Sequence, residues 1–111
     1  MPKSDKALSV GAVMILHALA RGAGYGFDII EETGLTSGTV YPTLDRLERA
    51  GLARSSWEDA AVAHREKRPP RRYFAITDTG KAKLIEALDR YKALAPVRID
   101  GVAYPTQARP S

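Results

Sequence analysis

Two short helical patterns joined by a tight turn constrain the fold of this chain more than any other feature. The first covers residues 25–33 and the second residues 36–50, where Thr36 or Ser37 can cap the helix. Gly34-Leu35 turns the chain between the patterns, and Gly51 ends the second one, because glycine tolerates the left-handed conformation at a helix C-terminus. This order predicts a helix-turn-helix unit.

The flanking segments extend this unit on both sides. Before it, apolar residues at helical spacing predict a first helix capped by Ser4 or Ser9: Leu8, Ala12, Ile15, Leu16 and Leu19. After it, residues 52–57 and 72–77 have the pattern of two short strands. The charged connection between the strands contains Pro69-Pro70 and is long for a hairpin, so it is either functional or mobile. The predicted fold class is mainly α with a small β wing (α+β), a winged helix-turn-helix.

A further helix is predicted after the second strand, with Thr77 as its cap and the acidic Asp78 in its first turn. Its apolar residues are spaced four, three and four apart, which suits packing against another helix. On the first helix, Val13 adds apolar surface outside the main stripe, where a partner subunit could cover it. The expected dimer interface is therefore Val13, Leu84, Leu88, Tyr91 and Ala95.

The second helix of the central pair has two different faces. Val40, Leu44 and Leu47 point one way. In the preceding helix Phe27 and Ile30 are expected to point inward, with Ile29 as a further candidate. The opposite face is small, hydroxylated and basic, which suits DNA, although an ordinary solvated helix explains the same pattern equally well. The candidate DNA-binding residues on this helix are Thr36, Ser37, Gly38, Thr39, Tyr41, Pro42, Thr43, Arg46 and Arg49.

Positive charge is concentrated in the connection between the strands. Residues 65–72 contain five cations and one anion, a net charge of +4, and the whole chain also carries +4, so the remainder is neutral. Such a segment can neutralise phosphates, or it can be a solvated loop. The candidate contacts in the wing are Arg65, Lys67, Arg68, Arg71 and Arg72.

Several other classes of protein are not expected. The apolar stretches fall short of the roughly 20 residues needed to cross a bilayer, and the absence of cysteine favours a cytoplasmic protein. Two separated histidines predict no metal site, and no spacing of serine, histidine and aspartate predicts an enzyme or a cofactor. Trp57 is expected to anchor the base of the wing rather than to stack on a planar ligand.

Three runs carry a resemblance to a known family: YGFDII at residues 25–30, SGTVYPTLDRLERAGL at 37–52 and RYFAITDTG at 72–80. In this order they resemble the PadR-like transcriptional regulators over roughly residues 8–94. The resemblance implies a homodimeric winged-helix repressor, with the third helix and the wing on DNA and the C-terminal helix in the dimer interface. Residues 25–36 are shorter than expected for the family, and the single C-terminal helix resembles its short branch.

These observations together predict a division of the chain and a function. Residues 1–77 form a winged-helix DNA-binding domain, residues 78–96 a dimerisation helix and residues 97–111 a tail. The predicted function is sequence-specific repression from a palindromic operator on double-stranded DNA, relieved by a small aromatic or hydrophobic effector between the subunits. The alternative is a winged-helix module that binds another protein.

Overall fold

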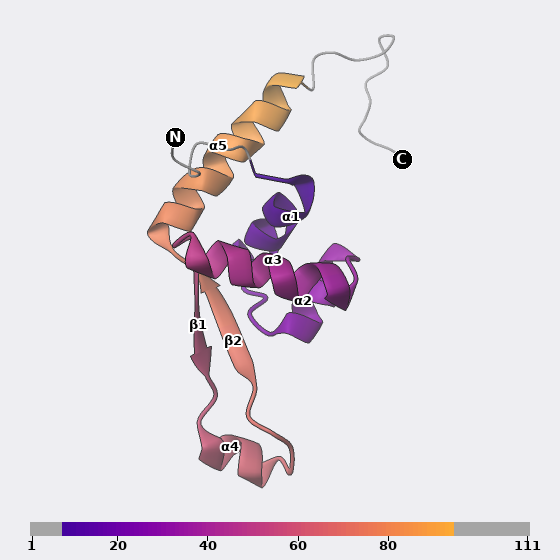
Figure 1. Ribbon diagram of the computed structural model, residues 1–111, viewed down its shortest axis with the longest axis vertical. Helices are drawn as coiled ribbons and strands as arrows, with labels where there is room; N and C mark the ends of the chain where they lie inside the picture. The colour runs from indigo at the N-terminus through magenta and orange to yellow at the C-terminus, as the bar shows by residue number, and fades with distance from the viewer. Residues whose placement is uncertain (1–7, 95–111) are drawn as a thin grey trace.

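The computed structural model describes residues 8–94, which form three packed helices with a helix on one side and a long wing on the other (Figure 1). The wing extends away from the helices and bears a short helix at its tip. In chain order the elements are α1 (Val10–Ala20), α2 (Gly26–Thr33), α3 (Ser37–Arg49), β1 (Ala53–Trp57), α4 (Ala60–Arg65), β2 (Arg72–Ile76) and α5 (Asp78–Leu94).

The three helices begin and end close to the predicted positions. Ser9 caps α1, since its side chain accepts a hydrogen bond from the backbone N–H of Ala12 at 3.1 Å. Gly34 and Gly51 adopt positive φ angles of 74° and 80° after α2 and α3, which lets the chain turn sharply at both points. The winged helix-turn-helix class is confirmed.

The core lies where α1, α2 and α3 meet. Its largest fully buried side chains are Ile15, Leu16, Ile29, Val40 and Leu44. The inward face predicted for α3 is confirmed by the burial of Val40, Leu44 and Leu47. The inward position predicted for Phe27 is wrong, because Ile29 fills the core and leaves Phe27 55% exposed.

The wing is an antiparallel pair in which Ala53 lies opposite Ile76 and Trp57 opposite Arg72. The segment before α2 pairs with the edge of β2 that faces away from β1. The N–H of Phe74 donates to the carbonyl of Gly24 at 2.8 Å, and Tyr25 forms a bridge with Tyr73. The connection between the strands contains α4, which the sequence analysis did not predict. Asp59 caps this helix by accepting from the N–H of Ala61 at 2.8 Å.

Helix α5 is fixed to the end of α3 at its first turn. The Thr77 hydroxyl donates to the Gly51 carbonyl at 2.7 Å and accepts from the N–H of Gly80 at 2.9 Å, so the predicted cap is confirmed. The described residues include no helix long and apolar enough to cross a membrane.

The predicted dimer residues divide into two groups. Val13 and Leu84 lie in the core of the single chain, where α1 packs against α5, so their side chains cannot supply a dimer surface. Leu88 and Tyr91 are exposed on α5, together with Ile85, which the sequence analysis did not include. Ala95 lies outside the described residues.

Candidate nucleic-acid interface

The outer face of α3 is free of the core along its whole length. Thr36, Ser37, Gly38, Thr39, Pro42, Arg46 and Arg49 are all exposed. The hydroxyl of Thr36 donates to that of Thr39 at 3.3 Å, and Arg46 donates through Nη2 to the Thr43 hydroxyl at 3.2 Å. This face therefore presents hydroxyls and guanidinium groups, which can bond phosphates and base edges.

Two of the α3 candidates lie elsewhere. Thr43 is only 3% exposed, because it lies one turn from Val40 and Leu47 on the core side, so its assignment as a direct DNA contact is wrong. Its hydroxyl instead positions Arg46. Tyr41 is half-exposed on the flank facing the wing, and its ring lies against Gly26, where a Cβ would overlap the ring.

Pro42 lies inside α3, which continues through it from Ser37 to Arg49. Proline has no N–H to donate to the carbonyl four residues earlier, and the residue there is Gly38. Both residues are exposed on the outer face. The surface at this point is consequently small and free of side-chain donors, which allows a close approach to a groove.

Glu48 of α3 binds the root of the wing. Its Oε1 accepts from Arg72 Nη2 at 2.7 Å, and its Oε2 accepts from the hydroxyl of Ser55 at 2.8 Å. The guanidinium of Arg72 also lies over the Phe74 ring at 4.9 Å from its centroid. Arg72 therefore fixes the wing relative to α3 and is partly neutralised.

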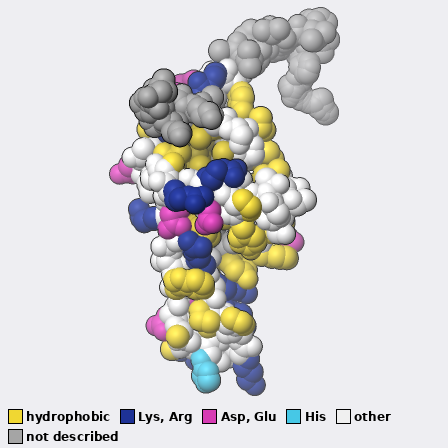
Figure 2. All heavy atoms as spheres, in the orientation of Figure 1, with side chains coloured by type: hydrophobic (Ala, Val, Ile, Leu, Met, Phe, Trp, Pro, Cys, Tyr) yellow, Lys and Arg dark blue, Asp and Glu magenta, His cyan; other side chains and the backbone are white. Residues whose placement is uncertain are grey.

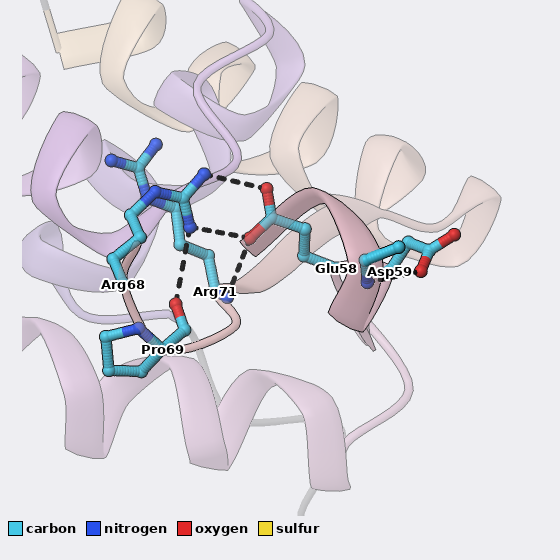
Figure 3. Close-up of polar contacts among 6 residues, drawn as sticks. Glu58, Asp59, Arg68, Pro69 and Arg71 are labelled. Carbon is cyan, nitrogen blue, oxygen red and sulfur yellow. Dashed lines mark hydrogen bonds and ion pairs between the residues drawn. The ribbon is translucent and has the colours of Figure 1, made fainter. Parts of the chain in front are cut away.

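Glu58 closes the tip of the wing (Figure 3). Arg68 binds both oxygens of its carboxylate, at 2.7 and 2.9 Å, and the backbone N–H of Arg71 donates to Oε1 at 3.1 Å. The backbone N–H of Glu58 donates to the Arg71 carbonyl at 2.7 Å. These bonds join the two ends of the segment that carries α4, so the connection is a closed structure rather than an open loop.

The ion pair changes the ionisation of Glu58. The hydrogen bonds from Arg68 are the largest cause that lowers the pKa of Glu58, from 4.5 to about 2, and burial opposes them. The pKa of Arg68 is raised by the same pair. Both groups remain charged at any physiological pH.

The five wing cations therefore do not act as one uniform patch. Arg68 and Arg72 are paired with carboxylates, whereas Arg65 and Lys67 are exposed at the tip. On the face seen in Figure 2, Lys and Arg side chains lie beside Asp and Glu over α3 and the root of the wing, and hydrophobic side chains are exposed over the wing below them. The predicted +4 is consequently reduced by Glu48 and Glu58.

A helix with a small, basic outer face beside a basic wing is the surface expected of a winged-helix regulator. The model of the transcriptional regulator PadR-like family matches residues 15–86. The chain belongs to this family. No curated protein sequence matches the chain.

Solved structures of regulators have the same fold as this PadR-like protein. A PadR family transcription regulator from Clostridium difficile R20291 is 22% identical, with a TM-score of 0.71 over 80% of this chain and 94% of its own. One from Eggerthella lenta DSM 2243 is 24% identical, with a TM-score of 0.62 over 77% of each chain. BpsR of Bordetella bronchiseptica, whose DNA binding is regulated by 6-hydroxynicotinic acid, is 20% identical, with a TM-score of 0.70 over 93% of this chain and 72% of its own.

Several residues of this PadR-like surface were not predicted from the sequence. Glu48 and Glu58 control the wing arginines, but no local pattern indicates which carboxylate pairs with which cation. Trp57 does not anchor the base of the wing as predicted; it lies at the far end of β1 and is 69% exposed. The signal for α4 was present, since Asp59 precedes a run of alanines and can cap a helix.

The Glu58 ion pair predicts a pH-dependent stability. We expect Glu58→Gln to lower the melting temperature at neutral pH, because the two hydrogen bonds from Arg68 lose their ionised acceptor. A pKa that is lowered from 4.5 to about 2 on folding stabilises the fold fully above pH 4.5, and this contribution is lost as the pH falls to about 2. The difference in melting temperature between the two proteins should therefore shrink across that range.

Thermal unfolding followed by circular dichroism at a series of pH values measures this difference. Glu31→Gln is the matched control, because Glu31 is an exposed carboxylate that makes no hydrogen bond or ion pair with any described residue. It reports the effect of removing one negative charge without a contact. A difference for Glu58→Gln that stays constant down to pH 2 would contradict the assignment.

Proposed function

We propose that this transcriptional regulator is a cytoplasmic, dimeric, sequence-specific repressor whose α3 enters the major groove of DNA. The observation that carries the proposal is the outer face of α3, where Gly38, Thr39, Pro42, Arg46 and Arg49 lie exposed beside a basic wing. Arginine can bond guanine O6 and N7 in a bidentate manner, and hydroxyls can bond bases or phosphates. The proposed DNA-binding domain covers residues 1–77.

A dimer is supported by the unpaired apolar surface of α5. Ile85, Leu88 and Tyr91 are exposed there, on the part of the chain assigned to dimerisation, residues 78–96. Two-fold symmetry then requires a palindromic operator with half-sites about one helical turn apart. The effector that relieves repression is proposed as a small aromatic or hydrophobic molecule. BpsR, which has the same fold, supports this proposal because 6-hydroxynicotinic acid regulates its DNA binding.

Selection of bound DNA from a random pool tests the proposal. We expect the enriched sequences to share a palindrome whose half-sites are about 10 base pairs apart, centre to centre. Gel shifts with the selected palindrome and with a scrambled version of equal composition then measure the preference. Equal affinity for the two would overturn sequence-specific binding and would favour the alternative, a winged-helix module that binds a protein.

The exposed cations of the wing tip give a second measurable result. We expect Arg65→Gln/Lys67→Gln to weaken binding to operator and scrambled DNA by the same factor, because these residues would neutralise phosphates without reading bases. The slope of log affinity against log salt should fall by about 1.8, since each neutralised phosphate accounts for roughly 0.9. Fluorescence anisotropy across a salt series measures it.

Arg90→Gln/Lys92→Gln is the matched control for the wing-tip variant. It removes the same two residue types, at the same spacing, from exposed positions on α5. The proposal predicts little change in its salt dependence. Equal slopes for the two double variants would show that the wing tip makes no phosphate contact of its own.

A further inference from the structure

A cleft of about 390 Å³ lies between the wing and the helix pair. We call it the wing cleft and define it by Tyr25, Tyr41, Trp57, Pro69, Pro70 and Arg71. Tyr25 precedes α2, Tyr41 lies on the flank of α3, and the others come from the far half of the wing. The cleft is thus walled by the same two elements that are proposed to bind DNA.

Arg71 differs from the other arginines of the wing cleft. Arg68 and Arg72 also line it, but each is paired with a carboxylate, Glu58 and Glu48 respectively. No carboxylate of the described residues forms an ion pair with the Arg71 guanidinium, which lies over the Tyr25 ring at 4.3 Å from its centroid. Its Nε is buried and has no hydrogen-bond partner in the described part of the chain.

Stacking on an aromatic ring fixes a guanidinium before any ligand arrives, so less side-chain entropy is lost on binding. A side-chain hydrogen bond with Tyr73, the largest cause that raises the pKa of Arg71, holds the guanidinium in the same place. Arg71 is therefore a pre-positioned cation in a cleft, and the group that fits it is an anion with several acceptor oxygens.

The remaining wall of the wing cleft is apolar and open to solvent. Trp57 is 69% exposed and Tyr41 is half-exposed, and Pro69 and Pro70 lie exposed nearby. Figure 2 shows hydrophobic side chains exposed over the wing, on the same face of the molecule as several Lys and Arg side chains. An anion that suits this cleft must carry an apolar, C–H-rich group beside its charge.

We propose that the wing cleft holds one deoxyribose-phosphate unit of the DNA backbone, with Arg71 on the phosphate and the sugar against Trp57 and Tyr41. The inference rests on the proposed function, because it assumes that α3 lies in a major groove and the wing reaches the adjacent groove. A sugar-phosphate strand separates neighbouring grooves, so it must pass through the angle between α3 and the wing. The wing cleft is lined by residues of both elements.

The test replaces single phosphates of the selected operator by neutral methylphosphonates, one linkage at a time. Wild-type protein should lose about tenfold in affinity at one linkage per half-site, between the bases facing α3 and the groove facing the wing. Arg71→Gln should lose about the same factor on the unmodified operator and should then be insensitive to that linkage. The slope of log affinity against log salt should be smaller by about 1 for Arg71→Gln than for the wild-type protein.

Three further measurements complete the design. Trp57 is the only tryptophan in the chain, so its emission should change when operator binds. Arg54→Gln is the control, since it removes an exposed arginine of β1 that does not line the cleft, and it should remain sensitive to the linkage. Arg71→Lys keeps the charge without the planar fork, so it should show a partial loss and serves if Arg71→Gln does not fold.

The inference would be overturned if no single methylphosphonate lowered the affinity in a way that depends on Arg71. The proposed function would still stand if the same protein preferred its operator to scrambled DNA. A change in Trp57 emission on adding a free aromatic anion, together with a flat methylphosphonate scan, would also overturn the inference and would assign the cleft to a small molecule. Wild-type protein without any sequence preference would overturn the proposed function and the inference with it.

Discussion

Gly80→Ala is expected to lower the free energy of unfolding by about 3 kcal/mol. A Cβ at this position would overlap the carbonyl oxygen of Leu52 and would lie 2.8 Å from Cγ1 of Ile76. Because the Leu52 carbonyl accepts a hydrogen bond from the N–H of Thr77 at 3.1 Å, neither neighbour can move without displacing the first turn of α5. The melting temperature should fall by roughly 12 to 24 °C.

Gly38→Ala is the matched control, measured by the same chemical and thermal unfolding. A Cβ there would meet only the Thr36 hydroxyl oxygen, at 3.8 Å, and alanine favours a helix over glycine by up to about 1 kcal/mol. Its stability should be unchanged or higher. If Gly80→Ala were as stable as Gly38→Ala, the close contact between α5 and the end of α3 would be wrong.

Leu88→Asp is expected to convert the proposed dimer into monomers and to lower the affinity for the palindromic operator by about 100-fold or more. Leu88 is 40% exposed on α5 beside Ile85, so a carboxylate at this position stays in solvent in a single subunit. In a dimer that covers this surface, the carboxylate would be buried without a partner, which is unfavourable. Two linked domains bind two half-sites with an avidity gain of about 10² to 10⁴, which a monomer loses. Light scattering and gel shifts measure the two effects.

Ala82→Asp separates the loss of the dimer from the mere addition of charge to α5. Ala82 is exposed on the same helix, six residues before Leu88 and about 120° away from it around the helix axis. It should leave both the mass in solution and the operator affinity nearly unchanged. A Leu88→Asp protein that remains dimeric would place the subunit interface elsewhere, and the apolar surface of α5 would then need another explanation.

The elements that the sequence predicted best are those specified by local spacing. The recurrence of Val40, Leu44 and Leu47, the glycines after α2 and α3, and the Thr77 cap all depend on residues within a few positions of one another. The structure confirms each of them. The resemblance to the PadR-like regulators predicted the same order of elements independently, and the family match confirms that resemblance.

The predictions that were wrong depend on contacts between segments that are distant in the sequence. Phe27 and Ile29 are both apolar, and only the packing of α2 against α1 and α3 decides which one is buried. Val13 and Leu84 were predicted to face a partner subunit, but the packing of α1 against α5 places both residues in the core of one chain. The pairing of Arg72 with Glu48 joins residues 24 positions apart, which no periodicity reveals. Charge counted along the sequence therefore overestimated the free positive charge of the wing.

The extra pairing of β2 has a consequence for the behaviour of this protein at high concentration. A two-stranded ribbon normally has two open edges, each able to recruit a strand from another molecule and so to start aggregation. Here the backbone around Gly24 and Tyr25 covers the outer edge of β2. Within residues 8–94 the outer edge of β1 has no strand partner, but it carries the exposed cation Arg54, a charge that disfavours edge-to-edge association. The wing can thus extend into solvent without becoming a template for self-association.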